Sequence, residues 1–276
     1  MGALQTDTAV RKVEDRLTAT LSRDWEIWGP NGGYVAGIAL RAAGTAAPPD
    51  HRPASFSCQY MSVAAFEEVT IEATPMKKGR SAWLINVALK QNDRTFLQAQ
   101  VWTTNRSQGP SQADAVMPDA AAPAALKFTH EHLPPGTPPW GGFWSNIDAK
   151  PTVWLGPGVR HPEGAVVREW YRYKDFQADG DVFLDYVRPL ILIDTLIWPA
   201  HHRGLGPRPD YIAPSLDLTV WFHQPPGPTE WLLAEARADI AQEGLIHGRT
   251  RIWSEDGRLI ATGGSQLLLV SRDPPA

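Results

Sequence analysis

An aspartate within a long apolar run is the residue whose setting most suggests chemistry. Asp194 is the only charged residue in the segment 190–198. A buried carboxylate costs free energy unless it is hydrogen-bonded, and one that persists in such a setting is a candidate functional residue. Two interpretations follow from the residues alone: a functional carboxylate, or a structural aspartate that caps a neighbouring helix or strand end.

A Gly-Gly pair is the second feature that could take part in chemistry. Asn31 precedes Gly32, Gly33 and Tyr34, and small apolar residues follow at helical spacing to about residue 43. The spacing predicts a helix that Asn31 caps. The first amides of a helix have no partners within it, so they can bind an anion or polarise a carbonyl. The glycines could equally allow close packing of the helix against a sheet, and both interpretations stay open.

Cysteine and histidine chemistry is not favoured. Cys58 is the only cysteine, so no internal disulfide can form, and its place in a predicted strand favours a buried structural thiol over a nucleophile. His201, His202 and His223 lack the Cys or carboxylate spacing of a tetrahedral metal site. Nucleotide loops, nucleophile elbows and dehydrogenase fingerprints are absent from the sequence, so we expect no metal and no cofactor.

Composition sets the broad class. The chain has 276 residues, 43% of them hydrophobic and 20% charged, which is typical of a globular protein with one or two domains. The net charge of −4 disfavours a nucleic-acid partner, which needs a basic face. The N-terminus lacks the basic and apolar regions of a signal peptide, and no run approaches 18 apolar residues. We therefore expect no membrane partner and a cytoplasmic location.

The elements that must position these residues form two similar halves. Residues 1–110 carry a helix followed by strands, residues 111–160 are a Pro/Gly/Ala-rich connection, and residues 161–276 repeat the pattern. Several tryptophans in the connection predict that much of it packs against a domain. In the second half, residues 190–198 could be a buried helix or strand, and the analogy between the halves favours a helix.

Two turn signals fall at matching places in the two halves. Residues 91–94 predict a hairpin between two strands, and residues 253–259 predict another with Asp256-Gly257 in its turn. Two copies of one unit account for this repeat most simply. We expect an α+β fold of two tandem antiparallel sheets, each wrapped around a long apolar helix.

The combination of motifs resembles the acyl-CoA thioesterase II-like family. Residues 28–34 resemble the start of that family's first helix, and residues 79–81 resemble its Gly-Arg-Ser turn. In the second half the matching segments are residues 213–223, 230–233 and 256–266. The resemblance covers nearly the whole chain except the connection. It implies a double hot dog fold with the catalytic residues in the second half.

The resemblance also implies an active site made of an Asp, a Thr or Ser, and a Gln. Asp194 matches the Asp, Ser215 falls on the Thr/Ser position, and Gln266 falls on the Gln. Serine keeps the hydroxyl of threonine, so the chemistry should survive the exchange. Together the three would activate and hold a water that hydrolyses acyl-CoA to a free acid and CoA. Asp217 would share a strand face with Ser215 and is a candidate auxiliary group.

Further expectations concern the ligand and the assembly. Acyl-CoA is the expected substrate, and Gly32, Gly33 and Arg80 are candidate contacts to it. For Arg80, a contact with CoA phosphates competes with a solvated turn. A homo-oligomer is expected from the implied fold alone.

Two other functions were compared with hydrolysis. An enoyl-CoA hydratase with a hot dog fold would carry a Gly-Asp-x-Asn-Pro-x-His stretch, which the sequence lacks. A non-catalytic protein that binds acyl-CoA is the alternative from a different class. Polar residues at all three expected site positions favour the enzyme.

Overall fold

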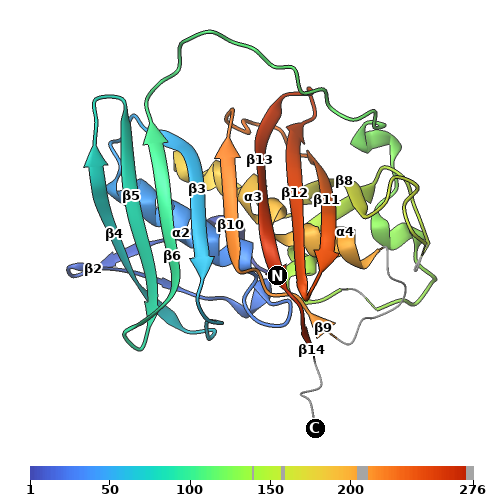
Figure 1. Cartoon of the computed structure of the whole chain (residues 1–276), viewed down its shortest axis with the longest axis horizontal. Coiled ribbons are helices and arrows are strands. Elements are labelled where there is room, and N and C mark those ends of the chain that lie inside the picture. Colours follow the sequence, from blue (N-terminus) through green and yellow to red (C-terminus); the bar gives the residue numbers. More distant parts are fainter. Residues whose placement is uncertain (139, 157–158, 204–210, 272–276) are drawn as a thin grey trace.

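A single curved sheet with two long helices on one face forms the body of the molecule (Figure 1). The computed structural model describes residues 1–138, 140–156, 159–203 and 211–271. The two helices are α2 (Gly32–Ala46) and α3 (Val182–Thr195), and both are almost wholly buried. No described helix is long and apolar enough to cross a membrane.

The strands of the large sheet come from both halves of the chain. The first half supplies β1 (Arg11–Val13), β2 (Arg16–Thr20), β3 (Arg52–Tyr60), β4 (Glu68–Lys78), β5 (Ala82–Gln91) and β6 (Arg94–Thr104). The second half supplies β7 (Ile147–Pro151), β8 (Val166–Tyr173), β10 (Asp217–Phe222), β11 (Leu232–Gln242), β12 (Leu245–Ser254) and β13 (Leu259–Leu268). The smaller elements are the helices α1 (Leu4–Asp7) and α4 (Ile197–His202), the 3₁₀ turns at Arg23–Trp25, Pro123–Ala125, Thr129–His132 and Gly142–Asn146, and a two-stranded sheet of β9 (Tyr211–Ile212) and β14 (Val270–Ser271).

The expectation of two separate sheets requires a correction. β3 and β10 pair antiparallel, from Asp217 opposite Gln59 to Trp221 opposite Ser55, and this pairing joins the halves into one twelve-stranded sheet. The join removes two edges that would otherwise expose unpaired backbone groups. From the centre outward the order is β3-β6-β5-β4-β2 on one side and β10-β13-β12-β11-β8 on the other. The halves are therefore related by an approximate two-fold axis between β3 and β10.

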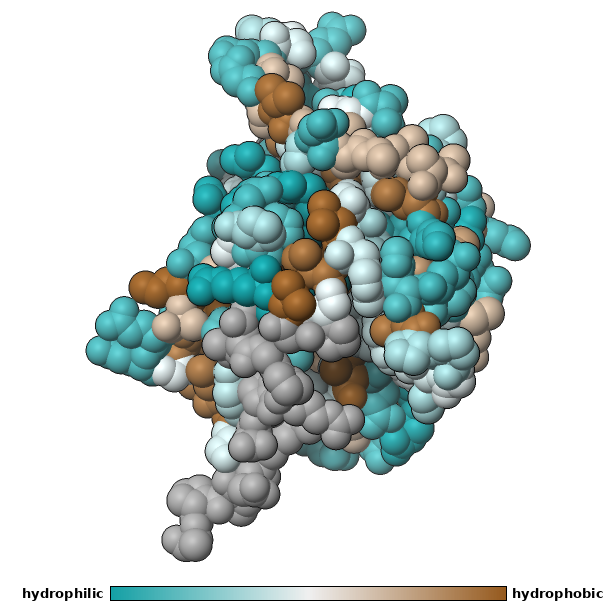
Figure 2. Space-filling view, turned by 90° about the vertical axis from the view of Figure 1, so that its right-hand side faces the viewer, coloured by the Kyte–Doolittle hydropathy of each residue, from teal (hydrophilic) through white to brown (hydrophobic). Residues whose placement is uncertain are grey.

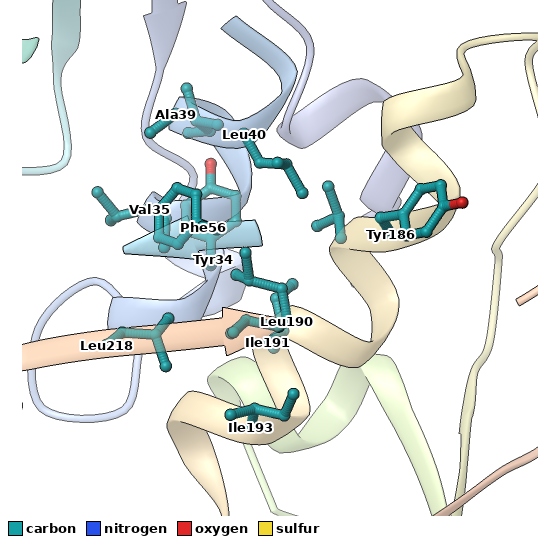
Figure 3. Packing of buried hydrophobic residues seen from close by; sticks show 14 of the residues in the cluster. Tyr34, Val35, Ala39, Leu40, Phe56, Tyr186, Leu190, Ile191, Ile193 and Leu218 are labelled. Carbon is teal, nitrogen blue, oxygen red and sulfur yellow. The ribbon is translucent and has the colours of Figure 1, made fainter. Parts of the chain in front are cut away.

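The two helices pack against each other through glycines. A Cβ added to Gly37 would lie 2.6 Å from Val187, and one added to Gly44 would lie 2.8 Å from the ring of Phe183. Residues from the two helices and from the central strands interdigitate in one core, as Figure 3 shows for Leu40 and Leu190. Small residues thus let two buried helices lie close together behind the sheet.

The second helix differs from its prediction at both ends. We expected residues 190–198, but α3 begins at Val182, where the Asp181 side chain accepts a hydrogen bond from the Phe183 amide. Pro189 lies inside the helix and removes one backbone donor, at a cost of about 3 kcal/mol in a helix interior. Burial of the helix between α2 and the sheet outweighs that cost. The proline makes a helix before residue 190 appear unfavourable, so the prediction leaves out the first turns.

The Pro-rich connection packs against the second half, as its tryptophans predicted. Met117, Leu126 and Phe128 contact a buried cluster of tryptophans. Residues Ile147–Pro151 of the connection form β7, the last strand of the sheet. On the side of the molecule where this connection lies, Figure 2 shows small apolar patches interspersed with hydrophilic side chains.

Candidate active site

Asp194 lies in the last turn of α3, where that helix meets the beginning of α2. Only 5% of its surface is exposed to solvent. The hydroxyl of Ser215 donates to Oδ1 at 3.0 Å and the hydroxyl of Tyr60 donates to the same oxygen at 3.3 Å. The amide of Gly33 lies near this carboxylate and helps to lower its pKa. The buried carboxylate is therefore held by hydrogen bonds, with no cation paired to it among the described residues.

Asn31 fixes the beginning of α2 beside this carboxylate. Its Oδ1 accepts from the Tyr34 amide at 2.8 Å, which confirms the predicted cap. Its Nδ2 donates to Thr195 Oγ1 at 3.0 Å, and that hydroxyl donates in turn to the carbonyl of Ile191 at 2.8 Å. One asparagine thus ties the first turn of α2 to the last turn of α3, next to Asp194.

The two glycines of α2 have different neighbours. A Cβ on Gly33 would lie 2.7 Å from the Ile191 Cα, so this glycine allows the backbones of the two helices to touch. A Cβ on Gly32 would lie 2.8 Å from Asp194 Oδ2 and 3.3 Å from the end of the Tyr60 ring, so this glycine lets both side chains lie against the start of α2. Gly32 is partly exposed, whereas Gly33 is buried. The pair therefore allows both the close packing of the two helices and the close approach of the carboxylate to the start of α2.

The protonation of Asp194 is displaced toward neutrality. Burial raises the pKa of this carboxyl from 3.8 to about 6, against the opposing effect of the hydrogen bonds from Ser215, Gly33 and Tyr60. A base works best when its pKa lies near the working pH. At neutral pH the group is ionised yet retains more basicity than an exposed aspartate.

Tyr60 is a site residue that the sequence did not single out. It ends β3 in the first half, and the β3–β10 pairing carries it to Asp194. Burial is the main cause that raises the pKa of the Tyr60 hydroxyl, so it stays a neutral donor. Cys58, on the same strand, is fully buried as predicted, and burial raises the pKa of its thiol. A neutral buried thiol fits a structural role.

The structure brings Ser215 to Asp194 but leaves Gln266 on the other face of the sheet. On β13, a Cβ at Gly263 would meet Ile193 of α3, and Ser265 and Leu267 are buried on that same inner side. Side chains alternate along a strand, so Gln266 points away from α3. Its backbone amide donates to Asp217 Oδ1 at 2.9 Å, and its carbonyl accepts from the Leu216 amide at 2.8 Å.

Arg80 lies far in space from Asp194 in the folded chain. It is exposed in the turn between β4 and β5. After that turn, Ala82 pairs with Thr104, and Thr104 pairs with Arg52 at the opposite end of β3 from Tyr60. Each strand residue adds about 3.3 Å, so most of the length of β3 separates the turn from Asp194. The guanidinium therefore stands in a solvated turn of this chain.

Exposed apolar side chains lie in the chain segments next to the Asp194 site. Trp28 is 41% exposed, shortly before Gly32, and a Cβ on Gly29 would meet Val63 at 3.2 Å. The Tyr60 amide donates to the Leu216 carbonyl at 3.0 Å, which places the residues after β3 beside those before β10. We call the exposed members of this group the apolar rim: Ile27, Trp28, Met61, Val63 and Leu216.

The histidines noted in the sequence have other neighbours. His223 Nε2 lies 2.9 Å from the Thr262 hydroxyl, and His201 Nε2 lies 3.5 Å from the Tyr211 hydroxyl. Within the described residues, no group of three or more His, Cys, Asp or Glu side chains is placed to hold a metal ion.

Comparison with known families covers most of the chain. Residues 21–104 match the family model of the acyl-CoA thioesterase N-terminal domain, and residues 110–270 match that of the acyl-CoA thioesterase C-terminal domain. Acyl-coenzyme A thioesterase 8 of Mus musculus is 29% identical over 100 residues, which are 34% of this chain and 29% of that protein. The Homo sapiens protein of the same name is 28% identical over 100 residues, 34% of this chain and 30% of that protein. The match therefore spans less than a third of these relatives.

Solved structures show the same fold over their full length. A protein with a hot dog fold from Alicyclobacillus acidocaldarius has a TM-score of 0.79 at 22% identity, with 99% of this chain and 98% of that chain covered. The acyl-CoA thioesterase II TesB2 from Mycobacterium marinum has a TM-score of 0.78 at 19% identity, with 97% and 98% covered. The fold is thus that of hot dog proteins. With both domain models matched in order along one polypeptide, the chain belongs to the acyl-CoA thioesterase family.

Proposed function

We propose that this protein hydrolyses acyl-CoA thioesters, with Asp194 as the general base. The observation that carries the proposal is the buried carboxylate, whose pKa is raised to about 6 and whose Oδ1 is fixed by Ser215 and Tyr60. Its other oxygen, Oδ2, lies against Gly32 at the start of α2. A carboxylate fixed through one oxygen is suited to accept a proton from a water molecule at the other.

The reaction balances with water as the only co-substrate. Water attacks the thioester carbonyl carbon while Asp194 Oδ2 takes one of its protons. The tetrahedral intermediate then collapses, the carbon–sulfur bond breaks, and the protonated carboxyl returns its proton to the leaving sulfur. The products are a carboxylic acid and CoA, and Asp194 is regenerated as the carboxylate.

The beginning of α2 is suited to stabilise the oxyanion. The Tyr34 amide donates to Asn31 and the Gly33 amide lies near the Asp194 carboxylate, whereas the Gly32 amide has no hydrogen-bond partner among the described residues. A free amide at a helix N-terminus carries partial positive charge toward a developing negative oxygen. We assign the thioester carbonyl contact to Gly32 and the positioning of the base to Gly33.

The apolar rim supplies a surface for the non-reacting part of the substrate. Val63 lies next to Gly29, which follows Trp28 in the sequence, and Leu216 follows Ser215 directly. An acyl chain that covers these side chains would exclude water from them, at about 25 cal/mol per Å² of apolar surface. This supports a substrate with an aliphatic acyl group.

The expected Asp/Ser/Gln set is modified in this proposal. Ser215 and Tyr60 are positioning residues because their hydroxyls contact the base, and Tyr60 takes the third place in the set. Gln266 contributes through its backbone, which links β13 to the residues around Ser215.

The pH dependence of hydrolysis follows from the raised pKa of Asp194. The base must be ionised, so kcat/KM should fall about tenfold per pH unit below about 6 and level off above it. Steady-state rates between pH 4.5 and 8 measure this limb. A flat profile down to pH 4.5 would contradict the assignment of the base.

Ser215→Ala should reduce kcat about tenfold, since it removes one hydrogen bond from the carboxylate. The acidic limb should also move to higher pH, because the Ser215 hydrogen bond lowers the pKa of Asp194. Gln266→Ala is the matched control and should keep kcat within about threefold, since single lost contacts away from the reacting groups cost little. A large loss of kcat in Gln266→Ala with a small loss in Ser215→Ala would instead show that the Gln266 side chain belongs to the site.

Release of CoA thiol from acyl-CoAs of increasing chain length tests the function itself. Cleavage of at least one chain length supports hydrolysis and supplies the specificity. If the protein binds acyl-CoA across the series without releasing thiol, the non-catalytic alternative replaces the enzyme.

A further inference from the structure

The approximate two-fold axis gives the Asp194 site a counterpart at the other end of the helices. The Asp194 site lies where α2 begins, α3 ends, β3 ends and the residues just before β10 pass. The counterpart lies where α3 begins, α2 ends, β10 ends and β3 begins. The structure has a cavity of about 380 Å³ at this place, which is within the size range of small-molecule sites. We call it the counterpart cavity, and its lining includes Arg52, Phe176, Val182, Leu184, Tyr186 and Pro225.

The counterpart cavity lacks a base at the matching position. Asp194 stands thirteen residues after Asp181, the N-cap of α3, and the same step from Asn31, the N-cap of α2, reaches Gly44. The ring of Phe183 fills the space beside Gly44. The counterpart cavity therefore does not repeat the arrangement of the proposed base, and we consider it as a binding site.

Arg52 is a cation without an acidic partner at this cavity. Its guanidinium donates to the backbone carbonyls of Pro53 and Arg106, both at 3.4 Å, and lies beside the Tyr186 hydroxyl, with no carboxylate paired to it among the described residues. The two aspartates in the lining already have partners: Asp181 pairs with Arg41 at 2.8 Å, and Asp185 pairs with Arg188 at 2.8 Å. Within the described residues, Arg52 is thus left as the positive group that an added anion could neutralise.

Tyr186 supplies a second polar group behind Arg52. Its hydroxyl is buried and has no hydrogen bond of good geometry within the described part of the chain. The positive charge of Arg52 acts on this hydroxyl, and burial raises its pKa, so it is a neutral donor. Figure 3 shows the hydroxyl end of Tyr186 turned away from the packed core residues. A buried hydroxyl without a partner costs free energy that an acceptor would relieve.

The rest of the lining is mainly apolar. Phe176, Leu184 and Pro225 contribute aromatic or aliphatic surface, and Val182 is 49% exposed at the cavity. A ligand that satisfies both the unpaired guanidinium and the apolar wall has a negatively charged head and an aliphatic tail.

We propose that the counterpart cavity binds an aliphatic monocarboxylate, with its carboxylate on Arg52 and Tyr186 and its chain on Phe176, Val182, Leu184 and Pro225. Such a ligand belongs to the chemical class of the acid that thioester hydrolysis releases. The proposal does not depend on that reaction, because binding can be measured in the absence of acyl-CoA. Tyr186 and Asp194 are eight residues apart on α3, about 12 Å, so the two sites can be tested separately.

Calorimetric titration of the full chain with octanoate tests this site. The wild type and Asp194→Asn should bind octanoate alike. Arg52→Gln should weaken binding at least tenfold and Tyr186→Phe several-fold, while Arg94→Gln, an exposed arginine outside the cavity lining, should change nothing. Arg52→Gln should also leave thiol release from acyl-CoA unchanged, and circular dichroism with thermal melting should show each variant folded.

Two further probes separate the head from the tail. Octanol should bind more weakly than octanoate and be insensitive to Arg52→Gln, and inorganic phosphate should not displace octanoate. Equal binding of octanoate to wild type and Arg52→Gln would overturn the proposal, as would its loss only in Asp194→Asn. Displacement by phosphate at comparable concentration would show a general anion site and also overturn it.

Discussion

Asp194→Asn should reduce kcat by about 100-fold to 10,000-fold, the usual contribution of a general base. The amide cannot take a proton from water, yet its carbonyl oxygen can still accept from Ser215 and Tyr60, which now hold Oδ1. Acyl-CoA binding should therefore persist. Thiol release and substrate affinity, measured on the same preparation, separate the loss of chemistry from the loss of binding.

Asp217→Asn is a matched control for this result. Asp217 is a nearby carboxylate that accepts from the Gln266 amide at 2.9 Å, a bond that asparagine can keep. This variant should retain kcat within about threefold. A large loss in Asp217→Asn together with a small one in Asp194→Asn would transfer the base to the other carboxylate.

The same exchange at position 194 should raise stability at neutral pH. The folded-state pKa of Asp194 is about 6, above its ordinary 3.8, so the protonated carboxyl is favoured in the folded state. Its contribution to the free energy of unfolding is fully present below about pH 4 and is lost as pH rises through 6. Two pKa units correspond to about 3 kcal/mol. Urea unfolding should find Asp194→Asn more stable than wild type by up to that amount at pH 7.5, with the difference vanishing near pH 3.5. A pH-independent difference would contradict the raised pKa.

Gly33→Ala should destabilise the fold by about 3 kcal/mol or more. The new Cβ would lie 2.7 Å from the Cα of Ile191, which is backbone and cannot rotate away. Relief requires α2 and α3 to separate, and this also pulls the Gly33 amide from Asp194. Thermal and urea unfolding measure the loss.

Gly141→Ala supplies the control for that substitution. A Cβ at Gly141 would meet nothing within 4 Å, and its φ of −93° suits any residue. Its unfolding free energy should stay within about 0.5 kcal/mol of wild type. Equal effects of the two exchanges would show that the contact between the helices is not tight at Gly33.

The residues that could be predicted from the sequence are those whose role is local. The Asn31 cap, the turn at Asn92 and Asp93, and the turn at Gly257 depend on neighbours within a few residues, and the structure has each of them. Asp194 belongs with these because a lone charge in an apolar helix is visible without knowing what surrounds it.

The rest depends on pairings between distant segments. Tyr60 reaches Asp194 across 134 positions of sequence through the β3–β10 pairing, and no local pattern marks that pairing. The same pairing merges the two expected sheets into one. Gln266 shows a different difficulty: a shift of one position along a strand moves a side chain to the other face. Ser265, not Gln266, lies on the inner side of β13.

The most direct test of the central claim is a single turnover of a cleavable acyl-CoA in H₂¹⁸O, with enzyme in excess. If Asp194 activates water, the released acid carries ¹⁸O from the first turnover and the peptide that contains Asp194 stays unlabelled. If the label enters Asp194 and the first acid released is unlabelled, the carboxylate attacks the thioester itself. The claim of a water-activating base would then be contradicted.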